Sequence, residues 1–142
     1  MLVLWKVAGD VKFQCVKILV AFTGDVYKGL DAVSMSEKNL KFSQKHFRIL
    51  SGLYGMLKPL DLIQAYRLEM GTKMQFSEQH SNLYSFWKET LTDKLNSELK
   101  ETKSSYILNL ASNEYAKAIN FKNIQAEVIS PVFKDWKNGE YK

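Results

Sequence analysis

The chain has 142 residues, of which 46% are hydrophobic and 25% charged, and its formal net charge is +5. Aromatic residues make up 13%, with seven glycines and two prolines, and this composition excludes an intrinsically disordered chain. The single cysteine, Cys15, excludes an intrachain disulfide framework and is typical of a reducing cytoplasm.

The positive charge is concentrated in the first 60 residues. Residues 1–60 contain nine Lys and Arg against four Asp and Glu, a balance of +5, whereas residues 61–142 contain eleven of each sign. Such an asymmetry favours a polyanionic partner. The longest apolar run near the start, Ile18–Phe22, is too short for a membrane span, which needs about 20 residues. We therefore expect no membrane association.

The first predicted elements are a buried strand at Ile18–Phe22, a turn, and a loop at Val26–Leu30. Ser34 followed three residues later by Glu37 predicts a capping box at the start of a helix from about Ser36 to Leu50. The basic residues of this helix are spaced by 3, 4 and 3 positions, which places them on one face within about 80° of arc. They are Lys38, Lys41, Lys45 and Arg48. The other side carries apolar residues that we expect to face a core, namely Leu40, Phe42, Phe47, Ile49 and Leu50.

This basic row has two interpretations. Most charged helix faces are only solvated, but a row of cations also suits a track of phosphates. The next segment, Ser51–Pro59, contains Gly52, Gly55 and Lys58, and a short second helix is expected at Leu60–Ile63. A helix, a glycine turn and a second helix form the layout of a helix-hairpin-helix unit, here over residues 36–63, which holds the DNA backbone. The alternative is a plain turn between helices, whose glycines serve packing.

The remaining elements predict a fold of the α+β class, with a mixed sheet and surrounding helices. Strands are expected at Tyr66–Gly71, Ser105–Leu110, Ala126–Ile129 and Val132–Trp136. Ser81 is expected to cap a long helix from Asn82 to about Lys100, and Ser112 or Asn113 a short one to about Ile119. In the first of these strands, Arg67 and Glu69 share a face, where an ion pair is preferred over an anion site.

The end of the chain carries a hairpin signal, Asn138-Gly139. Only three residues follow this dipeptide, and we expect them to be too few for a returning strand. The sequence therefore predicts a fold that is incomplete at its C-terminus.

Signatures of catalysis are scarce. There is no P-loop, dinucleotide-binding fingerprint or nucleophile elbow. His46 and His80 lack neighbouring ligands at metal-binding spacing, so neither a metal nor a cofactor is expected. The alternative is an enzyme acting on a small anionic substrate with the following residues in one pocket: Asp25, Tyr27, Arg67, Asn113 and Glu114. Helix capping explains Asn113 and its neighbours with fewer assumptions and is preferred.

Five segments resemble, in order, the YaaA family of bacterial peroxide-stress proteins. They are Phe22–Leu30, Phe47–Leu62, Tyr66–Gly71, Asn109–Tyr115 and Pro131–Phe133. The resemblance implies a fold with a basic cleft and a helix-hairpin-helix element, a cytoplasmic location and DNA binding. It also implies a role in limiting oxidative damage by lowering free intracellular iron. Residues 1–17 and both ends lack the family's pattern, which predicts a single partial domain over residues 1–142.

The leading hypothesis is a non-enzymatic protein of the peroxide-stress response that contacts the DNA backbone without reading sequence. The expected phosphate contacts are Lys38, Lys41, Lys45, Arg48 and Lys58, and Gly52 and Gly55 form the expected hairpin. The alternatives are the enzyme described above and a non-functional fragment.

Overall fold

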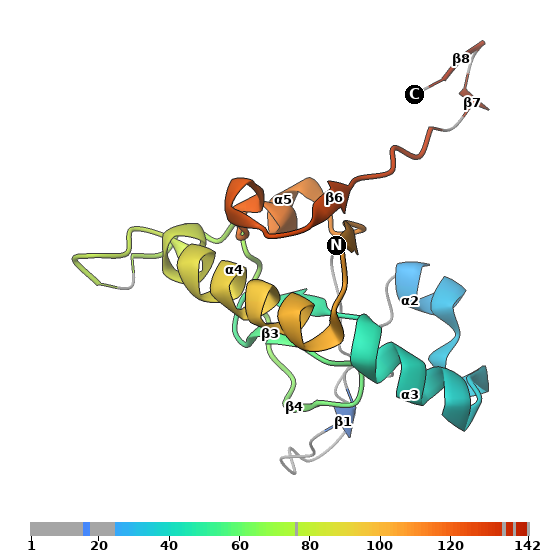
Figure 1. Cartoon of the computed structure of the whole chain (residues 1–142). Coiled ribbons are helices and arrows are strands. Elements are labelled where there is room, and N and C mark those ends of the chain that lie inside the picture. The colour runs from blue at the N-terminus through green and yellow to red at the C-terminus, as the bar shows by residue number, and fades with distance from the viewer. Residues whose placement is uncertain (1–15, 18–24, 76, 135, 138, 142) are drawn as a thin grey trace, which may run out of the picture. The chain divides into compact units, whose positions relative to one another are not determined.

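The structure, a computed structural model, describes residues 16–17, 25–75, 77–134, 136–137 and 139–141. The chain divides into two compact units, Met1–Thr72 and Lys73–Lys142, and each is described separately below. Helices and short paired strands occur in both units (Figure 1), which confirms the α+β class. Within these residues, no helix combines the length and the apolar character that crossing a bilayer requires. The single-domain organisation stays a prediction.

Among its described residues, the first unit contains three short helical segments and two antiparallel strand pairs. Strand β2 pairs with β3, and β1 with β4. The predicted strand at Ile18–Phe22 lies outside the described residues. The predicted loop at Val26–Leu30 is wrong, because helix α2 occupies this stretch. The elements are β1 (Val16–Lys17), α2 (Asp25–Leu30), η1 (Ala32–Ser34), α3 (Glu37–His46), β2 (Ile49–Ser51), β3 (Gly55–Leu57) and β4 (Leu62–Ile63).

Helix α3 begins two residues later than the capping box predicts. The hydroxyl of Ser36 accepts a hydrogen bond of 3.2 Å from the backbone N–H of Asn39, so Ser36 is the N-cap. The hydroxyl of Ser34 instead donates to the carbonyl of Asp31, at 2.9 Å. The predicted cap at Ser34 is therefore wrong, and Glu37 occupies the first helical position, where its charge favours the helix dipole.

Helix α3 also ends earlier than predicted, at His46 instead of Leu50. Phe47 already has extended backbone angles, φ −103° and ψ 137°. In the following strand, Ile49 and Ser51 are buried on one side and Leu50 is half-buried on the other. This alternation is that of a half-buried strand. Burial of Ile49 against the core outweighs the helical spacing of the local sequence, because tertiary packing routinely overrides propensity.

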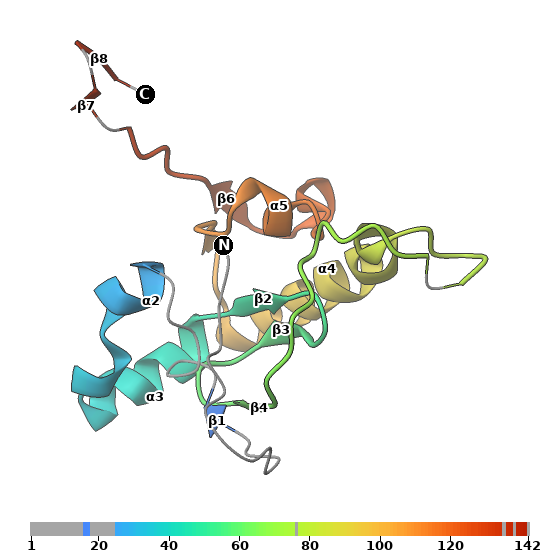
Figure 2. The ribbon, with the colours of Figure 1, turned by 180° about the vertical axis from the view of Figure 1, so that it is seen from behind.

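The helix-hairpin-helix unit predicted over residues 36–63 is wrong. A turn at residues 52–54 joins β2 to β3 in an antiparallel hairpin (Figure 2), and the expected second helix is strand β4. Gly55 has a φ of 75°, the left-handed conformation that closes a three-residue hairpin loop. Gly52 packs so closely that a Cβ atom would lie 2.5 Å from the carbonyl oxygen of Leu68. Both glycines thus serve the hairpin and its packing.

The core of the first unit lies on the strands. Ile49, Leu57 and Ile63 are buried, and partly buried side chains from α2, η1, α3 and the hairpin surround them. The predicted strand at Tyr66–Gly71 is wrong, because residues 64–69 have no regular secondary structure. Tyr66 is nevertheless held in place by a hydrogen bond between its hydroxyl and that of the buried Ser51.

In the second unit, the structure confirms the long helix, the short helix and the strands predicted at Ser105–Leu110 and Ala126–Ile129, although the short helix ends at Ala116 instead of Ile119. Helix α4 is capped by Asn82 instead of Ser81: the side chain of Asn82 accepts from the N–H of Ser85 at 2.9 Å. The predicted strand at Val132–Trp136 is wrong, because residues 132–134 belong to no strand. The elements are α4 (Leu83–Thr102), β5 (Tyr106–Leu108), α5 (Asn113–Ala116), η2 (Phe121–Asn123), β6 (Glu127–Ile129), β7 (Trp136–Lys137) and β8 (Glu140–Tyr141).

Strands β5 and β6 are parallel and are connected through α5 and η2. The connection is fixed to the middle of α4 by side chains one helical turn apart. The hydroxyl of Thr92 accepts from the N–H of Asn120 at 2.9 Å, and the side chain of Asn96 accepts from the N–H of Gln125 at 2.8 Å. Asn96 also donates to the carbonyl of Asn123 at 2.9 Å.

The last described element is a small hairpin. Strands β7 and β8 pair antiparallel, Trp136 opposite Tyr141 and Lys137 opposite Glu140. Gly139, with a φ of 85°, supplies the left-handed conformation that the tight turn requires. The prediction that the returning strand lacks residues is therefore wrong, because two residues suffice for it.

Candidate nucleic-acid interface

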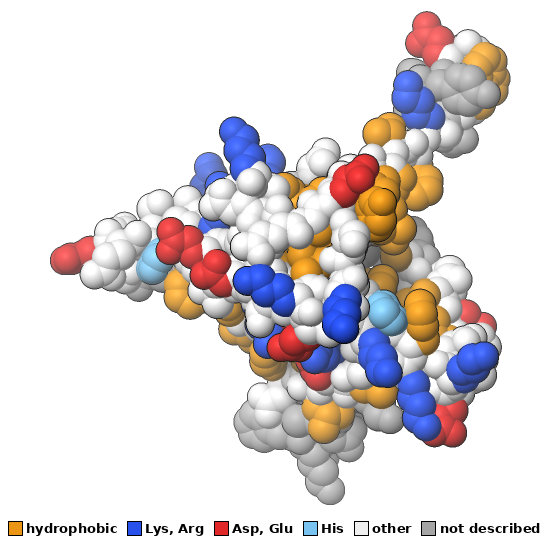
Figure 3. All heavy atoms as spheres, in the orientation of Figure 1, with side chains coloured by type: hydrophobic (Ala, Val, Ile, Leu, Met, Phe, Trp, Pro, Cys, Tyr) orange, Lys and Arg blue, Asp and Glu red, His pale blue; other side chains and the backbone are white. Residues whose placement is uncertain are grey.

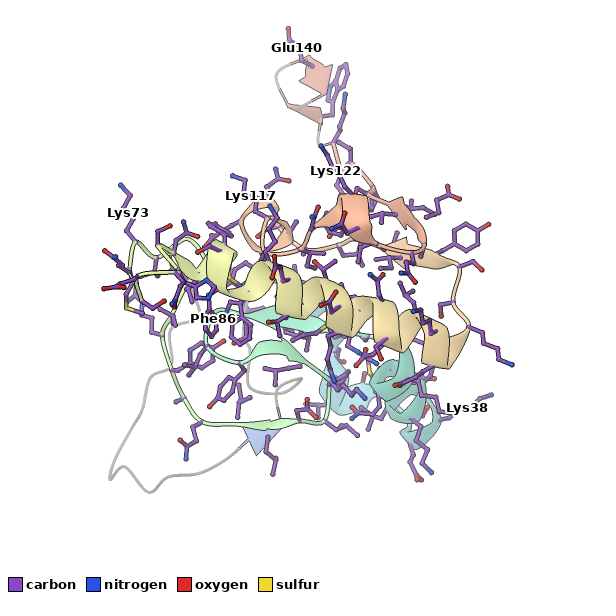
Figure 4. The ribbon with its side chains drawn as sticks, turned by 60° about the vertical axis from the view of Figure 1, so that its left-hand side comes forward. Lys38, Lys73, Phe86, Lys117, Lys122 and Glu140 are labelled. Carbon is purple, nitrogen blue, oxygen red and sulfur yellow. The ribbon has the colours of Figure 1, made fainter. Side chains whose placement is uncertain are left out.

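Three exposed lysines form a row on helix α3. Lys38, Lys41 and Lys45 are all exposed, and at about 100° per residue they lie within about 60° of arc. Figure 3 shows basic side chains gathered along α3, and Figure 4 shows Lys38 extending away from the ribbon. We call these three residues the lysine row.

Acidic side chains among the described residues neutralise little of the positive charge of the lysine row. Lys41 forms an ion pair of 2.6 Å with Glu37, and the two side chains are 73% and 80% exposed. An exposed pair of this kind on a helix contributes only about 0.3–0.5 kcal/mol. Lys38 and Lys45 form no ion pair with any residue in the described part of the chain. The row therefore remains able to bind an anion.

Arg48 does not belong to this row, contrary to the sequence prediction. Because α3 ends at His46, Arg48 lies in the extended segment that follows. Its guanidinium donates to the carbonyls of Gln44 at 3.2 Å and Phe47 at 2.7 Å. These are carbonyls at the C-terminal end of the helix, where a cation is favoured by the helix dipole. The prediction of four aligned cations is thus wrong at this position.

The other predicted contact residues lie after the hairpin or within it. Lys58 is half-buried, and its backbone N–H donates to the carboxylate of Asp61 at 2.8 Å. Gly52 and Gly55 are buried, so their backbone does not offer N–H groups to a phosphate. The two glycines therefore leave the candidate interface, whereas a phosphate contact by Lys58 stays a prediction.

An aromatic side chain borders the lysine row. Phe42 is 65% exposed although the sequence predicts that it faces the core. Its ring lies against that of His46, with centroids 4.5 Å apart and planes tilted by 34°. The signal was present in the sequence: Phe42 follows Lys38 by four residues and precedes Lys45 by three, and such positions are neighbours on a helix.

A pocket of about 350 Å³ opens beside Phe42. Its walls come from the end of α2, from the residue before the N-cap of α3 and from α3 itself. The lining residues are Leu30, Met35, Asn39, Phe42, Ser43, His46 and Phe47.

The residues of the alternative enzyme site are distributed over both units. Tyr27 packs against the core of the first unit, and Arg67 is exposed. In the second unit, Asn113 is exposed and Glu114 half-buried on α5. The side chain of Asp25 lies outside the described residues. None of the four whose side chains the structure describes lines the pocket beside α3, and the enzyme hypothesis stays a prediction.

Among the residues that the structure describes, no three His, Cys, Asp or Glu side chains lie close enough together to hold a metal ion. Cys15 lies outside these residues. Burial, and secondarily the charge of Glu114, raises the pKa of Tyr84. Tyr84 therefore keeps its proton at neutral pH.

The relatives described here all carry the same name, UPF0246 protein. The chain is 57% identical over 124 residues to a UPF0246 protein of Colwellia psychrerythraea. The aligned stretch is 87% of this chain and 48% of the relative. A UPF0246 protein of Shewanella halifaxensis is 57% identical over 122 residues, 86% of this chain and 47% of that protein. One of Aliivibrio fischeri is 56% identical over 124 residues, with shares of 87% and 48%. The chain thus spans about half the length of the relatives it matches.

A sequence model of the family described as "Peroxide stress protein YaaA" matches residues 6–142. The match begins within the first 17 residues, so the expectation that none of them resembles the family is wrong from residue 6 onward. The rest of the match includes all five segments that carry the resemblance. The chain therefore belongs to the YaaA family of peroxide stress proteins.

Proposed function

We propose that this protein acts in the peroxide-stress response by binding DNA through the lysine row of helix α3. The contact is with the sugar–phosphate backbone and does not read sequence. The observation that carries the proposal is the exposure of Lys38, Lys41 and Lys45 on one helix face, with Lys38 and Lys45 unpaired among the described residues. We propose Arg48 and Lys58 as secondary contacts.

The length of the lysine row suits a phosphate strand. At a rise of 1.5 Å per residue, Lys38 and Lys45 are separated by about 10 Å along the helix axis. The phosphates of one strand advance by about 3.4 Å each along the axis of a DNA duplex, so a span of this length covers about three such steps. Each of the three flexible lysines can therefore reach a phosphate within this span.

The net charge acts in the same direction. The first 60 residues carry the whole excess of +5, while the remaining residues balance to zero. A positive surface of this kind attracts DNA at a distance and accelerates encounter, and both effects weaken as salt rises.

The family likeness extends the proposal to a cytoplasmic protein that limits the damage done by iron. Lysines that neutralise phosphates release the counterions condensed on DNA. We propose that ferrous ions held at the backbone are among the cations displaced, which removes the metal from the place where peroxide would damage the strand. Iron- and peroxide-driven nicking of a plasmid is then expected to fall with the wild-type protein, and nicking that is unchanged at saturating protein would contradict this extension.

The DNA proposal is tested by salt titration. The affinity for a fluorescent duplex is measured at several salt concentrations for the wild type and for the Lys38→Ala, Lys41→Ala, Lys45→Ala triple variant. If each lysine neutralises one phosphate, the log–log slope of affinity against salt flattens by about 2–3 in the triple variant.

The matched control removes the same charge elsewhere. Lys73, Lys117 and Lys122 are exposed in the second unit, and their triple replacement by Ala changes the net charge equally. This control is expected to leave the slope within about one of the wild-type value. An unchanged slope in the α3 variant, or an equal loss in both variants, would remove α3 from the interface.

A further inference from the structure

The exposure of Phe42 requires an explanation that the lysine row alone does not give. A phenyl ring on a helix surface usually turns toward a core, but Phe42 is 65% exposed. On the helix its neighbours are Lys38, Lys45 and His46, at spacings of four, three and four residues. An apolar ring among cations is poorly suited to a plain solvated face, and it suits a ligand that is both charged and aromatic.

The pocket beside Phe42 has the chemistry of a site for a flat heterocycle. Its volume of about 350 Å³ is at the lower end of the range for small-molecule sites, roughly 300–1,000 Å³. Leu30, Met35 and Phe47 give it apolar walls. Asn39 adds a polar group with unused capacity, since its side-chain amide forms no hydrogen bond with the residues that the structure describes. An amide offers both a donor and an acceptor to the edge of a base.

We infer that this pocket takes one unpaired base of a DNA strand, stacked on the Phe42–His46 ring pair while the lysine row holds the neighbouring phosphates. The inference rests on the proposed DNA binding and adds to it the form of DNA preferred. Every base has a π-face, so stacking of this kind tolerates any sequence.

A base within a duplex does not reach such a pocket, because both of its faces are covered by its neighbours. Entry requires a single strand, or a base that has left the stack. The lysine row contacts phosphates in either form of DNA. The pocket therefore separates the two forms, and single-stranded DNA is the one that uses both features of α3.

The test compares two single strands with the same number of phosphates. One is an oligothymidylate of about ten nucleotides, and the other has the same length but carries abasic sugars in place of nucleotides. Both are labelled for fluorescence anisotropy and titrated with the full chain at a fixed low salt concentration. The wild type is expected to bind the strand with bases between about 5-fold and 150-fold more tightly, the range that one base–aromatic stack contributes.

Two phenylalanine variants locate the effect. Phe42→Ala is expected to bind the two strands equally, with the affinity that the abasic strand has for the wild type. Phe133→Ala is the matched control, because Phe133 is also a strongly exposed phenylalanine, 84% exposed, and lies in the second unit. The control is expected to keep the full preference for bases.

A third variant covers the case in which Phe42→Ala does not fold, as judged by circular dichroism. Phe42→Trp retains a stacking surface, so the preference for bases must persist. The strand with bases must also quench the added indole fluorescence, measured as the difference from the wild type, and the abasic strand must not.

The outcomes separate this inference from the proposed function. If the wild type binds both strands equally and binding still depends on salt, the stacking site is refuted and backbone binding stands. If neither strand nor a duplex binds, both fail. Loss of the preference in Phe133→Ala as well as in Phe42→Ala would also refute the placement of the site on α3.

Discussion

At the scale of single residues, the two glycines and the serine of the hairpin serve the packing of the first unit. Ser51 is fully buried, and its hydroxyl joins the backbone N–H of Tyr54, at 2.9 Å, to the hydroxyl of Tyr66. Gly52 leaves no space for a side chain. Residue types alone do not distinguish this role from a phosphate-binding turn, since glycine permits close approach to either a ligand or a neighbouring strand.

Gly52→Ala tests the packing role. The added methyl group would lie 2.5 Å from the carbonyl oxygen of Leu68 and 3.2 Å from its carbonyl carbon, both backbone atoms. We expect a loss of about 1–3 kcal/mol in the free energy of unfolding, measured by urea titration. Gly29→Ala is the control, because nothing lies within 4 Å of its added methyl group and alanine favours helix α2. Equal stability of the two variants would contradict the contact.

Tyr66 makes stability fall at alkaline pH. Burial first, and the neighbouring Tyr54 to a lesser extent, raise its pKa above the usual 10.0, although the hydrogen bond from Ser51 acts in the opposite direction. Above the unfolded-state pKa, the unfolded chain therefore binds fewer protons than the folded one, and the free energy of unfolding decreases as pH rises. The contribution of Tyr66 is complete below pH 10.0 and is lost as pH rises through the folded-state pKa.

The measurement is urea unfolding of the wild type and of Tyr66→Phe at several pH values on either side of 10. A phenyl ring does not titrate, so the decline above the unfolded-state pKa should be shallower in the variant. Below pH 9 the variant should be less stable by about 1 kcal/mol, because it lacks the hydrogen bond to Ser51. Parallel pH profiles would show that Tyr66 does not carry the effect.

At the scale of elements, the sequence predicted a helix or strand correctly where the apolar pattern was long or lay between clearly polar segments. Helix α4 follows from an apolar stripe over about five turns, and β5 and β6 from short apolar runs between polar segments. Prediction failed in residues 47–63, where the apolar positions fit a helix and a strand equally well. Antiparallel pairing with Leu57, eight residues later in the chain, places Ile49 in a strand, and the spacing of the apolar residues does not reveal this pairing.

The lysine row illustrates the same limit at the candidate site. Its first three cations are where the sequence places them, because they lie within the part of the helix that the sequence predicts. The position of the fourth, Arg48, is wrong together with the end of the helix. The exposure of Phe42 is also missed, since the pattern of an amphipathic helix directs an apolar residue toward the core.

The start of α3 gives a direct test of its assigned cap. Ser36→Ala removes the side-chain acceptor for the N–H of Asn39 and should destabilise the protein by about 1 kcal/mol in urea unfolding. Ser34→Ala removes only an exposed hydrogen bond to the carbonyl of Asp31 and should change stability by less than about 0.5 kcal/mol. The reverse order would restore the capping box that the sequence predicts.

At the scale of the whole molecule, the two units differ in surface chemistry. The basic excess lies in the first 60 residues. In the second unit, the parallel pair β5–β6 presents large apolar side chains to solvent, with Leu108 59% and Ile129 45% exposed and opposite each other in register. Parallel sheets are ordinarily covered on both faces, so this exposure is unusual for such a sheet.

This apolar pair predicts concentration-dependent self-association, which light scattering coupled to size exclusion measures. Leu108→Thr with Ile129→Thr keeps residues that favour strands and should shift the equilibrium toward monomer. The half-buried neighbours Ile107 and Val128, changed to Ala, provide the comparison and should lower stability without reducing association. A monomer at every concentration in the wild type would contradict the prediction.

The attachment of residues 120–125 to α4 has a consequence for local opening. Thr92 and Asn96 hold the amides of Asn120 and Gln125, which lie outside regular strands and outside the long helix. These two amides are released only when the central turn of α4 or the segment itself detaches. Their deuterium uptake should therefore be slower than that of amides without a hydrogen bond, and uptake as slow as that of the helix centre would make this irregular stretch part of the same cooperative unfolding unit.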